Sequence, residues 1–407
     1  MTSTSTQAPH PAARSIGARG TLAALFAGNF VLGTDETLVI GLLVVVSGDL
    51  EVSVPAAGAL VTAYAAGLAL GGPLLTALTI RWDRRTVVVA SVTLFVVGNL
   101  LAVVSADYAL FLVARAATGA VHGLFLATAF GVATSVAAPG ASGRAMSTVL
   151  LGNTLAGAFG APLGTALGQQ WGWRGAILAV AVLGVAVLVA MWFVVPRLPG
   201  AAAGTDGRAM LRNAFAPRVV ALLALCLLVF ASTCAAWSYV VPFLQDVTGV
   251  PGTWTGAFVL LYGVGTAVGA YLGGRAADRD AGRTLVVGSI GMTAALAALH
   301  LFGSSVVAAA IALTALGLFA MGMAPSLQYR VVELAGPGAP MAQALPASSA
   351  NVGVAVGAAA GGVAIAQAGV PAAVVVGGAV GLAAVLVAAW TRRLRPTALP
   401  AARHDNS

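Results

Sequence analysis

Long apolar stretches separated by short polar breaks run along the whole chain. Runs such as 219–232 and 372–390 contain no charged residue. A helix needs roughly 20 apolar residues to cross a bilayer, and the stretches between the breaks predict about twelve such helices. We expect them at 20–46, 56–80, 86–104, 108–136, 145–167, 175–195, 219–243, 253–274, 284–302, 306–329, 343–366 and 372–391. The pattern therefore predicts an all-α membrane protein with twelve transmembrane helices.

The longest internal break, 196–218, is rich in proline, glycine and arginine and predicts a linker between two six-helix halves, 20–195 and 219–391. A shift of 198 residues aligns the halves and makes eleven positions of 64–91 identical, among them Tyr64 with Tyr262 and Arg81 with Arg279. Both copies leave a helix toward the same side, so the repeat is parallel. A parallel repeat of helical halves with a site between them is typical of transporters. The remaining segments, 1–19 and 392–407, are expected to be tails.

Charge is scarce and unevenly distributed. The chain has 407 residues, of which 59% are hydrophobic and 8% charged, and all twenty basic residues are arginine. With the N-terminus inside, eighteen of these arginines fall on the cytoplasmic side, Arg174 falls outside and Arg115 falls within a span. This positive-inside asymmetry predicts that both termini are cytoplasmic and that the protein lies in the plasma (inner) membrane. The net charge of +8 thus reflects contact with membrane lipid, and no nucleic-acid partner is expected.

Several classes of protein are disfavoured. Without lysine the chain cannot carry the phosphate-binding loop of an ATP-driven pump or form a Schiff base, so we expect no cofactor and an ion gradient as the energy source. No zinc motif is present, no metal site is expected, and Cys226 and Cys234 are expected to be packing or lipid-facing residues. An intramembrane enzyme using Ser142 remains a competing class, but its base would have to be His122 or His300, which lie in spans.

Apart from His300 near an outer end, four ionisable residues fall within the expected spans, and such residues are functional candidates because burying charge in a membrane is costly. Asp35 and Glu36 are neighbours in the first span and point about 100° apart, so they are not expected to face one cavity equally. Arg115 and His122 share one face of the fourth span. A carboxyl group whose arginine partner or water access changes with conformation can load and release a proton. The competing interpretation is a fixed ion pair that joins two helices.

Motifs near these positions resemble a known family. The stretch Gly274-Arg-Ala-Ala-Asp278-Arg279-Asp-Ala-Gly282-Arg283 is similar to the G-x-x-x-D-R-x-x-G-R loop of the major facilitator superfamily, and 112–119 (LVARAATG) is similar to its R-x-x-x-G motif of drug:proton antiporters. The stretches "GTDETLVIGLL" and "AVHGLF" resemble segments of chloramphenicol-type and arabinose or sugar exporters. In the first copy of the loop, Ile80 replaces the expected aspartate and Thr76 the expected glycine.

The resemblance implies roles for further residues. A gate at the cytoplasmic end is expected to use Arg81, Arg84, Arg85, Gly274, Asp278, Arg279 and Arg283, because charge-assisted bonds there can form in one conformation and break in another. The fifth span resembles the antiporter motif of exporters, with packing or kinking by Gly152, Gly157, Gly160, Pro162 and Gly164. Spans one, four, seven and ten would line the substrate cavity. Candidate contacts are Asn29, Phe30, Thr34, Asn153, Trp237, Tyr239, Met321, Met323 and Asn351.

The sequence therefore predicts a proton-coupled exporter that works by alternating access, expected to act as a monomer. Its expected partners are protons and a small drug-like substrate, with a chloramphenicol-like compound as the sharpest expectation. The proton-coupling candidates are Asp35, Glu36, Arg115 and His122. Export of sugars or other small metabolites stays open, because drug and sugar exporters of this branch share these motifs.

Overall fold

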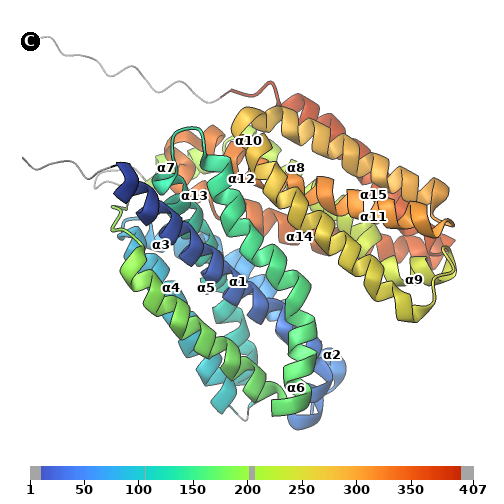
Figure 1. The fold of residues 1–407 in the computed structure, drawn as a ribbon, viewed down its shortest axis with the longest axis horizontal. Coiled ribbons are helices and arrows are strands. Elements are labelled where there is room, and N and C mark those ends of the chain that lie inside the picture. Colours follow the sequence, from blue (N-terminus) through green and yellow to red (C-terminus); the bar gives the residue numbers. More distant parts are fainter. Residues whose placement is uncertain (1–10, 106, 201–206, 396–407) are drawn as a thin grey trace, which may run out of the picture.

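The computed structural model describes residues 11–105, 107–200 and 207–395, and every regular element within these residues is helical (Figure 1). Of the expected tails and linker, residues 1–10, 396–407 and 201–206 lie outside the described residues. Ten helices in the described ranges are long and apolar enough to cross a membrane by length and composition. The protein is thus an all-helical membrane protein with at least ten candidate spans.

Two helices of the first half begin at an aspartate that caps them. In order they are α1 (Pro11–Asp49), α2 (Val54–Ala66), the π-helical turn η1 (Gly67–Gly71), α3 (Gly72–Thr79), α4 (Arg84–Val104), α5 (Tyr108–Val136) and α6 (Ser142–Val194). The Asp83 carboxylate accepts a hydrogen bond from the Thr86 backbone N–H (3.1 Å) at the start of α4. Asp107 does the same for Ala109 (2.9 Å) at the start of α5. The polar breaks of the sequence thus supply the N-caps that these helices need.

The second half follows a short linker helix. Its elements are α7 (Gly207–Ala214), α8 (Pro217–Trp237), α9 (Val240–Asp246), α10 (Gly252–Phe302), α11 (Val306–Gly322), α12 (Ala324–Ala335), the 3₁₀ turn η2 (Gly336–Gly338), α13 (Ala339–Ala342), α14 (Leu345–Ala368) and α15 (Pro371–Thr391). The predicted linker 196–218 therefore contains helix α7, which the proline and glycine content of that segment did not predict. The linker arginine Arg212 lies in the last turn of α7, where it complements the helix dipole.

Two of these helices are hairpins of two legs. Gly172 interrupts α6 with φ of 69° and ψ of 172°, in the region that favours glycine. Asp280 interrupts α10 with φ of −159° and ψ of 94°. In Figure 1 the chain turns back at both places, so α6 and α10 each contribute two neighbouring legs. Residue 172 lies beside the Trp171 and Trp173 side chains that the sequence placed in an outer loop.

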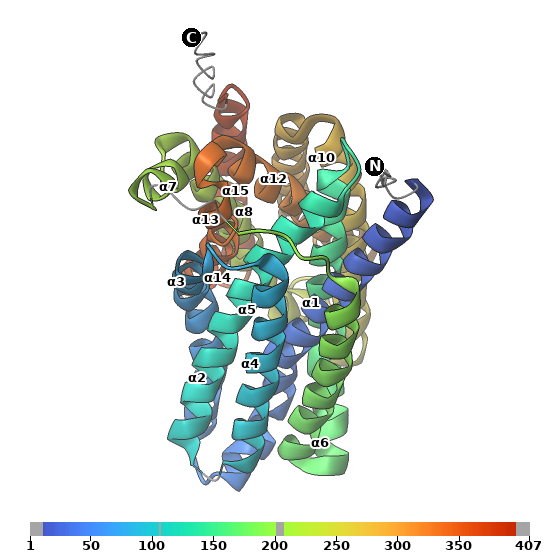
Figure 2. The ribbon, with the colours of Figure 1, turned by 90° about the vertical axis from the view of Figure 1, so that its left-hand side faces the viewer.

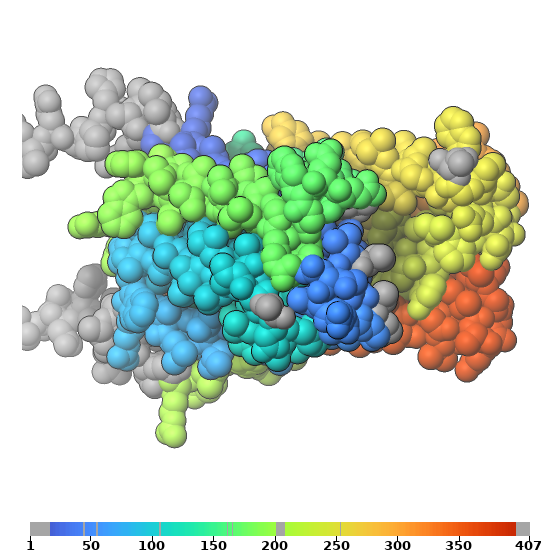
Figure 3. Space-filling model, turned by 90° about the horizontal axis from the view of Figure 1, so that it is seen from below, coloured from blue at the N-terminus to red at the C-terminus, as the bar shows by residue number. Residues whose placement is uncertain are grey.

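Each half has its own buried core. One cluster of buried apolar side chains extends from Ala24 to Val195 and includes Phe95, Phe125 and Trp173. A second cluster extends from Ala214 to Ala388. Figure 3 shows the two halves as separate masses, blue to green and yellow to red, that meet along a seam. A molecule with two separate cores can move the halves as units.

The two halves repeat the same helix crossing at the same residues. A Cβ atom added at Gly67 would lie 2.0 Å from the Ala116 carbonyl oxygen, and one at Gly265 would lie 2.2 Å from that of Thr314. The crossing also repeats at the shifted partners: an added Cβ at Gly119 would meet the Tyr64 carbonyl, and one at Gly317 would meet the Tyr262 carbonyl. The 198-residue shift read from the sequence is therefore a repeat of backbone contacts. Only glycine allows helices to approach this closely.

Helix α6 packs along α1 through the expected glycines, with one correction. Added Cβ atoms at Gly152, Gly160 and Gly164 would each collide with α1, at Phe26, Thr37 and Leu38 respectively. An added Cβ at Gly157 would meet no atom within 4 Å among the described residues, so its role in this packing was wrongly predicted: the space beside it is open. Pro162 is exposed and lies within helical backbone, whereas the break in α6 is at Gly172. Pro162 removes one backbone donor from the first leg, and the kink expected there stays a prediction.

The halves are in contact at one end of the bundle. We call the end where α1 begins and α15 ends the terminal end, and the opposite one the far end; the terminal end is at the top of Figure 2. The Ser147 hydroxyl donates to the Ala270 carbonyl (2.5 Å), and the Ser348 hydroxyl donates to the Ala69 carbonyl (2.6 Å). Both bonds join the two halves toward the terminal end. The structure is therefore closed there.

The far end of α1 is held by a polar contact within the first half. The Asp49 carboxylate accepts a hydrogen bond from the Trp173 indole N–H (2.8 Å) and pairs with the Arg174 guanidinium. The Trp173 hydrogen bond and the Arg174 contact hold the pKa of Asp49 below its usual value. Arg174, the one arginine expected outside, therefore ties α1 to the second leg of α6.

Candidate functional site

The helix crossing at Gly119 places an aromatic ring over a buried arginine. Because Gly119 lets α2 lie against α5, the Tyr64 ring packs over the Arg115 guanidinium, whose central carbon is 4.3 Å from the ring centroid. Tyr64 is fully buried and Arg115 is 2% exposed. A cation over an aromatic face is stabilised by the ring quadrupole, most strongly where water is excluded. The crossing therefore provides one of the partners that a charge needs inside the membrane.

Arg115 also pairs with Asp35 of α1. The Arg115 Nη1 donates to Asp35 Oδ2 at 2.6 Å, and both side chains are buried. The pair is incompletely satisfied, because Asp35 Oδ1 and the Arg115 Nε and Nη2 atoms have no hydrogen-bond partner among the residues that the structure describes. A pair that served only to join two helices would be expected to use both arms of the guanidinium. The remaining donors of Arg115 are free to take a second carboxylate.

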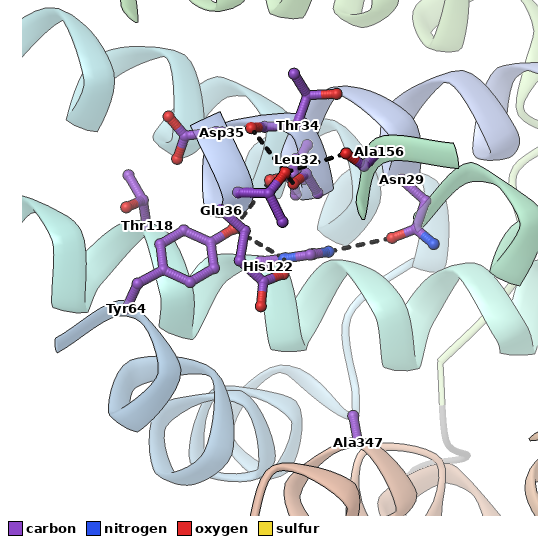
Figure 4. A network of polar contacts seen from close by, with 12 residues as sticks. Asn29, Leu32, Thr34, Asp35, Glu36, Tyr64, Thr118, His122, Ala156 and Ala347 are labelled. Carbon is purple, nitrogen blue, oxygen red and sulfur yellow. Dashed lines mark hydrogen bonds and ion pairs between the residues drawn. The ribbon is translucent and has the colours of Figure 1, made fainter. Parts of the chain in front are cut away.

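Glu36 and Asp35 face different surroundings, as the 100° between adjacent helix positions predicts. The Asp35 side chain is fully buried, whereas the Glu36 side chain is 28% exposed and lines a cavity. Its Oε2 lies 3.8 Å from His122 Nδ1. Figure 4 shows Glu36 beside the His122 ring and Asp35 pointing away from it. Of the two acids, Glu36 is the one that a ligand or a proton from the cavity can reach.

His122 stands between Tyr64 and Asn29 in a buried row (Figure 4). The Asn29 amide NH₂ donates to the Val149 carbonyl (2.7 Å), so its Oδ1 is free to accept from His122 Nε2 (3.1 Å). A neutral imidazole that donates from Nε2 has an acceptor at Nδ1. The Tyr64 hydroxyl, 2.8 Å from Nδ1, can donate to it or to the Leu32 carbonyl at 3.1 Å. One hydroxyl proton thus has two acceptors, the His122 ring and the Leu32 carbonyl.

Removing the Tyr64 hydroxyl tests this row. We expect Tyr64→Phe to keep the ring over Arg115 but to leave His122 Nδ1 and the Leu32 carbonyl without their donor, at a cost of about 1–2 kcal/mol. The pH dependence of transport should shift as well, because His122 loses its neighbour. Thermal unfolding in detergent and transport between pH 5.5 and 8.5 measure both effects. Tyr262→Phe, at the equivalent position of the second half, is the matched control, and equal shifts in both variants would contradict a specific role.

The cavity beside Glu36 lies between the two halves. It has a volume of about 210 Å³. The first half contributes Glu36, His122 and Phe130 to its wall, and the second half contributes Phe230 and Met321. Amide groups are also present, since Asn153, Gln328 and Asn351 line it. The cavity is therefore mostly apolar, with one acid and a few hydrogen-bonding groups, which is the usual composition of a small-molecule site.

Only some of the predicted substrate contacts line this cavity. Asn153, Met321 and Asn351 do. The others do not, because their side chains are engaged elsewhere: Asn29 with His122 and Val149, Thr34 with the Phe30 carbonyl, Phe30 against the first core, Trp237 in a stack on Tyr262, Tyr239 with the Ala358 carbonyl, and Met323 fully buried beside Ser289. Helical position alone could not distinguish a cavity-facing side chain from a packed one.

The charged turn of the second half contacts the first half directly. The Asp278 carboxylate accepts hydrogen bonds from the Gly143 backbone N–H (2.6 Å) and from Arg144 Nε (2.9 Å). Gly274 makes this approach possible, because an added Cβ there would lie 2.4 Å from the Ser147 Cβ. The motif residues Gly274 and Asp278 thus sit at the contact that closes the terminal end. Arg279 lines a cleft beside that contact, whereas Arg283 lines a groove on the outside of α10.

The three arginines of the first copy differ from one another. Arg84 lines a small cavity that it shares with Pro340 and Gln343 of the other half. Arg85 does not reach the other half: it donates to the Trp192 carbonyl and lies over the Trp192 ring of its own half. The role of Arg85 in a gate between the halves is thus corrected to one within the first half. Arg81 is exposed at the terminal end. Without the aspartate of the motif, this copy lacks the acceptor that Asp278 supplies in the second.

Sequence reasoning missed three residues of these sites. Tyr64 was noted only as a repeat position, and Arg144 only as a cytoplasmic charge, although it is the partner of Asp278. Cys226 was expected to face lipid or to pack, and it packs in the second core, where it is 2% exposed and lies 3.4 Å from the Pro346 carbonyl. Its position in the cavity wall was not predicted. For Tyr64 a signal was available, because Tyr64 and Gly67 are three residues apart and so lie on one face of the same helix. No signal pointed to Cys226.

The charged network belongs to the first half alone. At a shift of 198 residues, Asp35, Glu36, Arg115 and His122 correspond to Thr233, Cys234, Leu313 and Ala320. The same helix crossing is thus present in both halves, but it carries charge in only one. Among the described residues, no group of three or more His, Cys, Asp or Glu side chains is arranged to hold a metal ion.

A two-core helical bundle with a small-molecule cavity at the seam defines a membrane transporter, and comparisons with known proteins give the family. The family model described as Major Facilitator Superfamily matches residues 25–338 and 255–406. The chain belongs to the major facilitator superfamily. It is therefore a multi-pass transporter of the plasma membrane and not an enzyme.

Individual relatives are similar over most of their length. The chain is 34% identical to the inner membrane transport protein YdhP of Escherichia coli (strain K12), over 84% of this chain and 87% of that protein. It is 29% identical to a chloramphenicol resistance protein of Streptomyces lividans, over 80% and 84% of the two chains. The fold is similar to the crystal structure of the human organic anion transporter MFSD10, with a TM-score of 0.73, 16% identity, and coverage of 91% and 99%.

Proposed function

We propose that this transporter exports small drug-like molecules in exchange for protons. The observation that carries the proposal is the position of Glu36, a carboxylate at the wall of the cavity between the halves, 3.8 Å from His122. A charged carboxylate within the membrane costs free energy, so its presence there marks a functional residue. Glu36 can also be reached from the cavity. The incompletely satisfied pair of Asp35 and Arg115 lies behind it.

Twelve passes and two cytoplasmic ends fit the path of the chain. The ten candidate spans count both legs of α10 as one stretch, Trp254–Phe302, and omit the first leg of α6. Counting the legs separately gives twelve passes. Because this number is even, the first helix starts and the last helix ends on the same side of the membrane, at the terminal end. That end carries the arginine-rich turns, and the positive-inside rule makes it cytoplasmic. The structure is then the state closed toward the cytoplasm.

The lining favours a weakly polar substrate. Phe130, Phe230 and Met321 offer apolar, adaptable surface, whereas a sugar needs a dense set of hydrogen-bonding partners. Only a few amide and hydroxyl groups are present in the wall. Relatives that include a chloramphenicol resistance protein support the same choice. A chloramphenicol-like compound, with a ring and several polar groups, is the sharpest candidate, and export of sugars or other metabolites is the alternative.

Transport by alternating access follows from these parts. Substrate enters from the cytoplasm when the contact at Asp278 is open. A proton arriving from outside neutralises Glu36, and the change in charge alters what Arg115 and His122 bind. With Glu36 neutral, the halves can return to the state open toward the cytoplasm without carrying a bare charge through the membrane, and water that enters there takes up the proton. The two halves, each with its own core, rock about the cavity between them.

The test is Glu36→Gln, which keeps the shape of the side chain and removes its titration. We expect export driven by a pH gradient to fall by at least about tenfold, because charge neutralisation no longer drives the cycle. Exchange of labelled for unlabelled substrate, which needs no net proton movement, should continue. Both are measured in proteoliposomes with chloramphenicol as the probe.

Glu51→Gln is the matched control, since Glu51 is an exposed acid beyond the far end of α1. Export by Glu36→Gln at the rate of Glu51→Gln under the same pH gradient would contradict the coupling role. A panel of pentoses in the same vesicles separates the two substrate classes.

A further inference from the structure

A long groove follows the outside of the second half between α10 and α11. Its part nearest the terminal end has a volume of about 470 Å³ and is lined by Leu272, Val287 and Phe319. A second part of about 390 Å³ continues toward the far end and is lined by Leu261 and Ile311. Leu318 lines both parts, so they adjoin each other along α11. From Gly322 to Ile311 the groove follows eleven residues of α11, which is about 16 Å of helix.

The groove faces the membrane rather than the interior. Leu272 and Val287 are each 50% exposed, and Ile311 is 66% exposed. Such side chains in a transmembrane helix lie against lipid tails. An occupant of this groove therefore has an apolar part of about acyl-chain length.

Positive charge stands only at the terminal end of the groove. Arg279 and Arg283 line that end, and both are exposed. Neither guanidinium has an acidic partner among the described residues. The one acid in this part of the wall, Asp280, lies 3.8 Å from Arg392 and accepts a hydrogen bond from the Arg283 backbone N–H. The uncompensated charge at the mouth of the groove is therefore positive.

We propose that this groove binds an anionic phospholipid, with its phosphate headgroup at Arg279 and Arg283 and an acyl chain along α11 toward Ile311. The arginines sit at helix ends, at the level where headgroups lie, and basic side chains there attract anionic lipid. The apolar length of the groove matches a chain and not a soluble anion. The site is separate from the cavity of the proposed function and depends only on the membrane location of the protein.

Native mass spectrometry of the purified protein measures the lipid that stays bound. With dioleoyl phosphatidylglycerol we expect retained lipid, and with dioleoyl phosphatidylethanolamine much less. Each arginine near the membrane surface raises the affinity for an anionic lipid a few-fold. Arg279→Gln/Arg283→Gln should therefore lower phosphatidylglycerol retention roughly tenfold. Both positions are exposed, so the double variant is expected to fold, and size-exclusion chromatography checks this.

Two matched variants separate the headgroup from the chain. Arg197→Gln/Arg212→Gln removes the same two charges at exposed positions outside the groove and should retain lipid like the unmodified protein. Ala276→Phe fills the groove while leaving both arginines, and should also lose lipid. The proposal is overturned if the Arg279/Arg283 variant retains as much phosphatidylglycerol as the Arg197/Arg212 variant. The proposal is also overturned if Ala276→Phe retains as much phosphatidylglycerol as the unmodified protein. Displacement of the lipid by millimolar inorganic phosphate would overturn it as well. Either result would indicate a site for the anion alone.

Discussion

Replacing Arg115 with leucine is expected to abolish transport and to destabilise the first half. The change leaves the buried Asp35 carboxylate without its partner at 2.6 Å and removes the cation beneath the Tyr64 ring. Breaking a buried pair on one side costs about 3–5 kcal/mol, because the other charge stays buried and unpaired. The thermal unfolding temperature in detergent should fall clearly, and proton-driven export should fall by at least about a hundredfold.

The double variant Asp35→Leu/Arg115→Leu distinguishes a structural pair from a functional one. Replacing both charges with apolar side chains is often neutral for stability, and the equivalent of Arg115 in the second half is Leu313 on the same helix crossing. We therefore expect the double variant to regain most of the lost stability without regaining transport. Proton-driven export by the double variant at the unmodified rate would show that the pair only joins α1 to α5.

Asp278→Asn is expected to open the terminal end. The aspartate gives charged acceptor oxygens to the Gly143 N–H and to Arg144 across the seam, and its side chain is only 9% exposed. Hydrogen bonds to charged groups contribute about 1.5–3 kcal/mol each, less here because Arg144 is exposed. The asparagine keeps one neutral acceptor. The closed state should lose at least about tenfold in population, and transport should slow accordingly.

Distances between spin labels on the two halves measure this change. Trp82→Cys and Trp390→Cys place labels on exposed positions of the first and second half respectively, in a protein whose native Cys226 and Cys234 are replaced by alanine. Asp278→Asn should add a population with a longer distance. Asp280→Asn is the matched control, because Asp280 lies two residues away and pairs only within the second half. Identical distance distributions in the two variants would contradict a gating contact at Asp278.

The sequence indicated the class of the fold and the location of its charge. Apolar stretches of spanning length must be helical in a membrane, since backbone groups find no water there. The arginine distribution and the repeat around Tyr64 and Tyr262 were also visible in the sequence. In the structure the repeat is a close helix crossing at glycines, present in both halves. Because charge in a membrane is expensive, the few ionisable positions in the spans were visible without coordinates.

Side-chain direction could not be read from the sequence. Gly157 and Gly160 are three residues apart on one helix, yet only Gly160 meets α1. Met321 and Met323 are two residues apart, yet only Met321 lines the cavity. Within a helix that is apolar on every side, no amphipathic stripe marks which face meets a neighbour, a cavity or lipid. The rotation of each helix is therefore decided by its packing.

The sequence by itself determined that this chain is a helical membrane protein of two like halves, with acids and an arginine buried in the first, because membrane burial constrains composition so strongly. Only the tertiary structure decided that Glu36 faces the cavity while Asp35 pairs with Arg115, that Tyr64 and Asn29 hold His122, and that Arg144 receives Asp278. The residue pairs in these contacts are between 58 and 134 positions apart in the sequence, and their geometry depends on how closely glycine lets the helices approach.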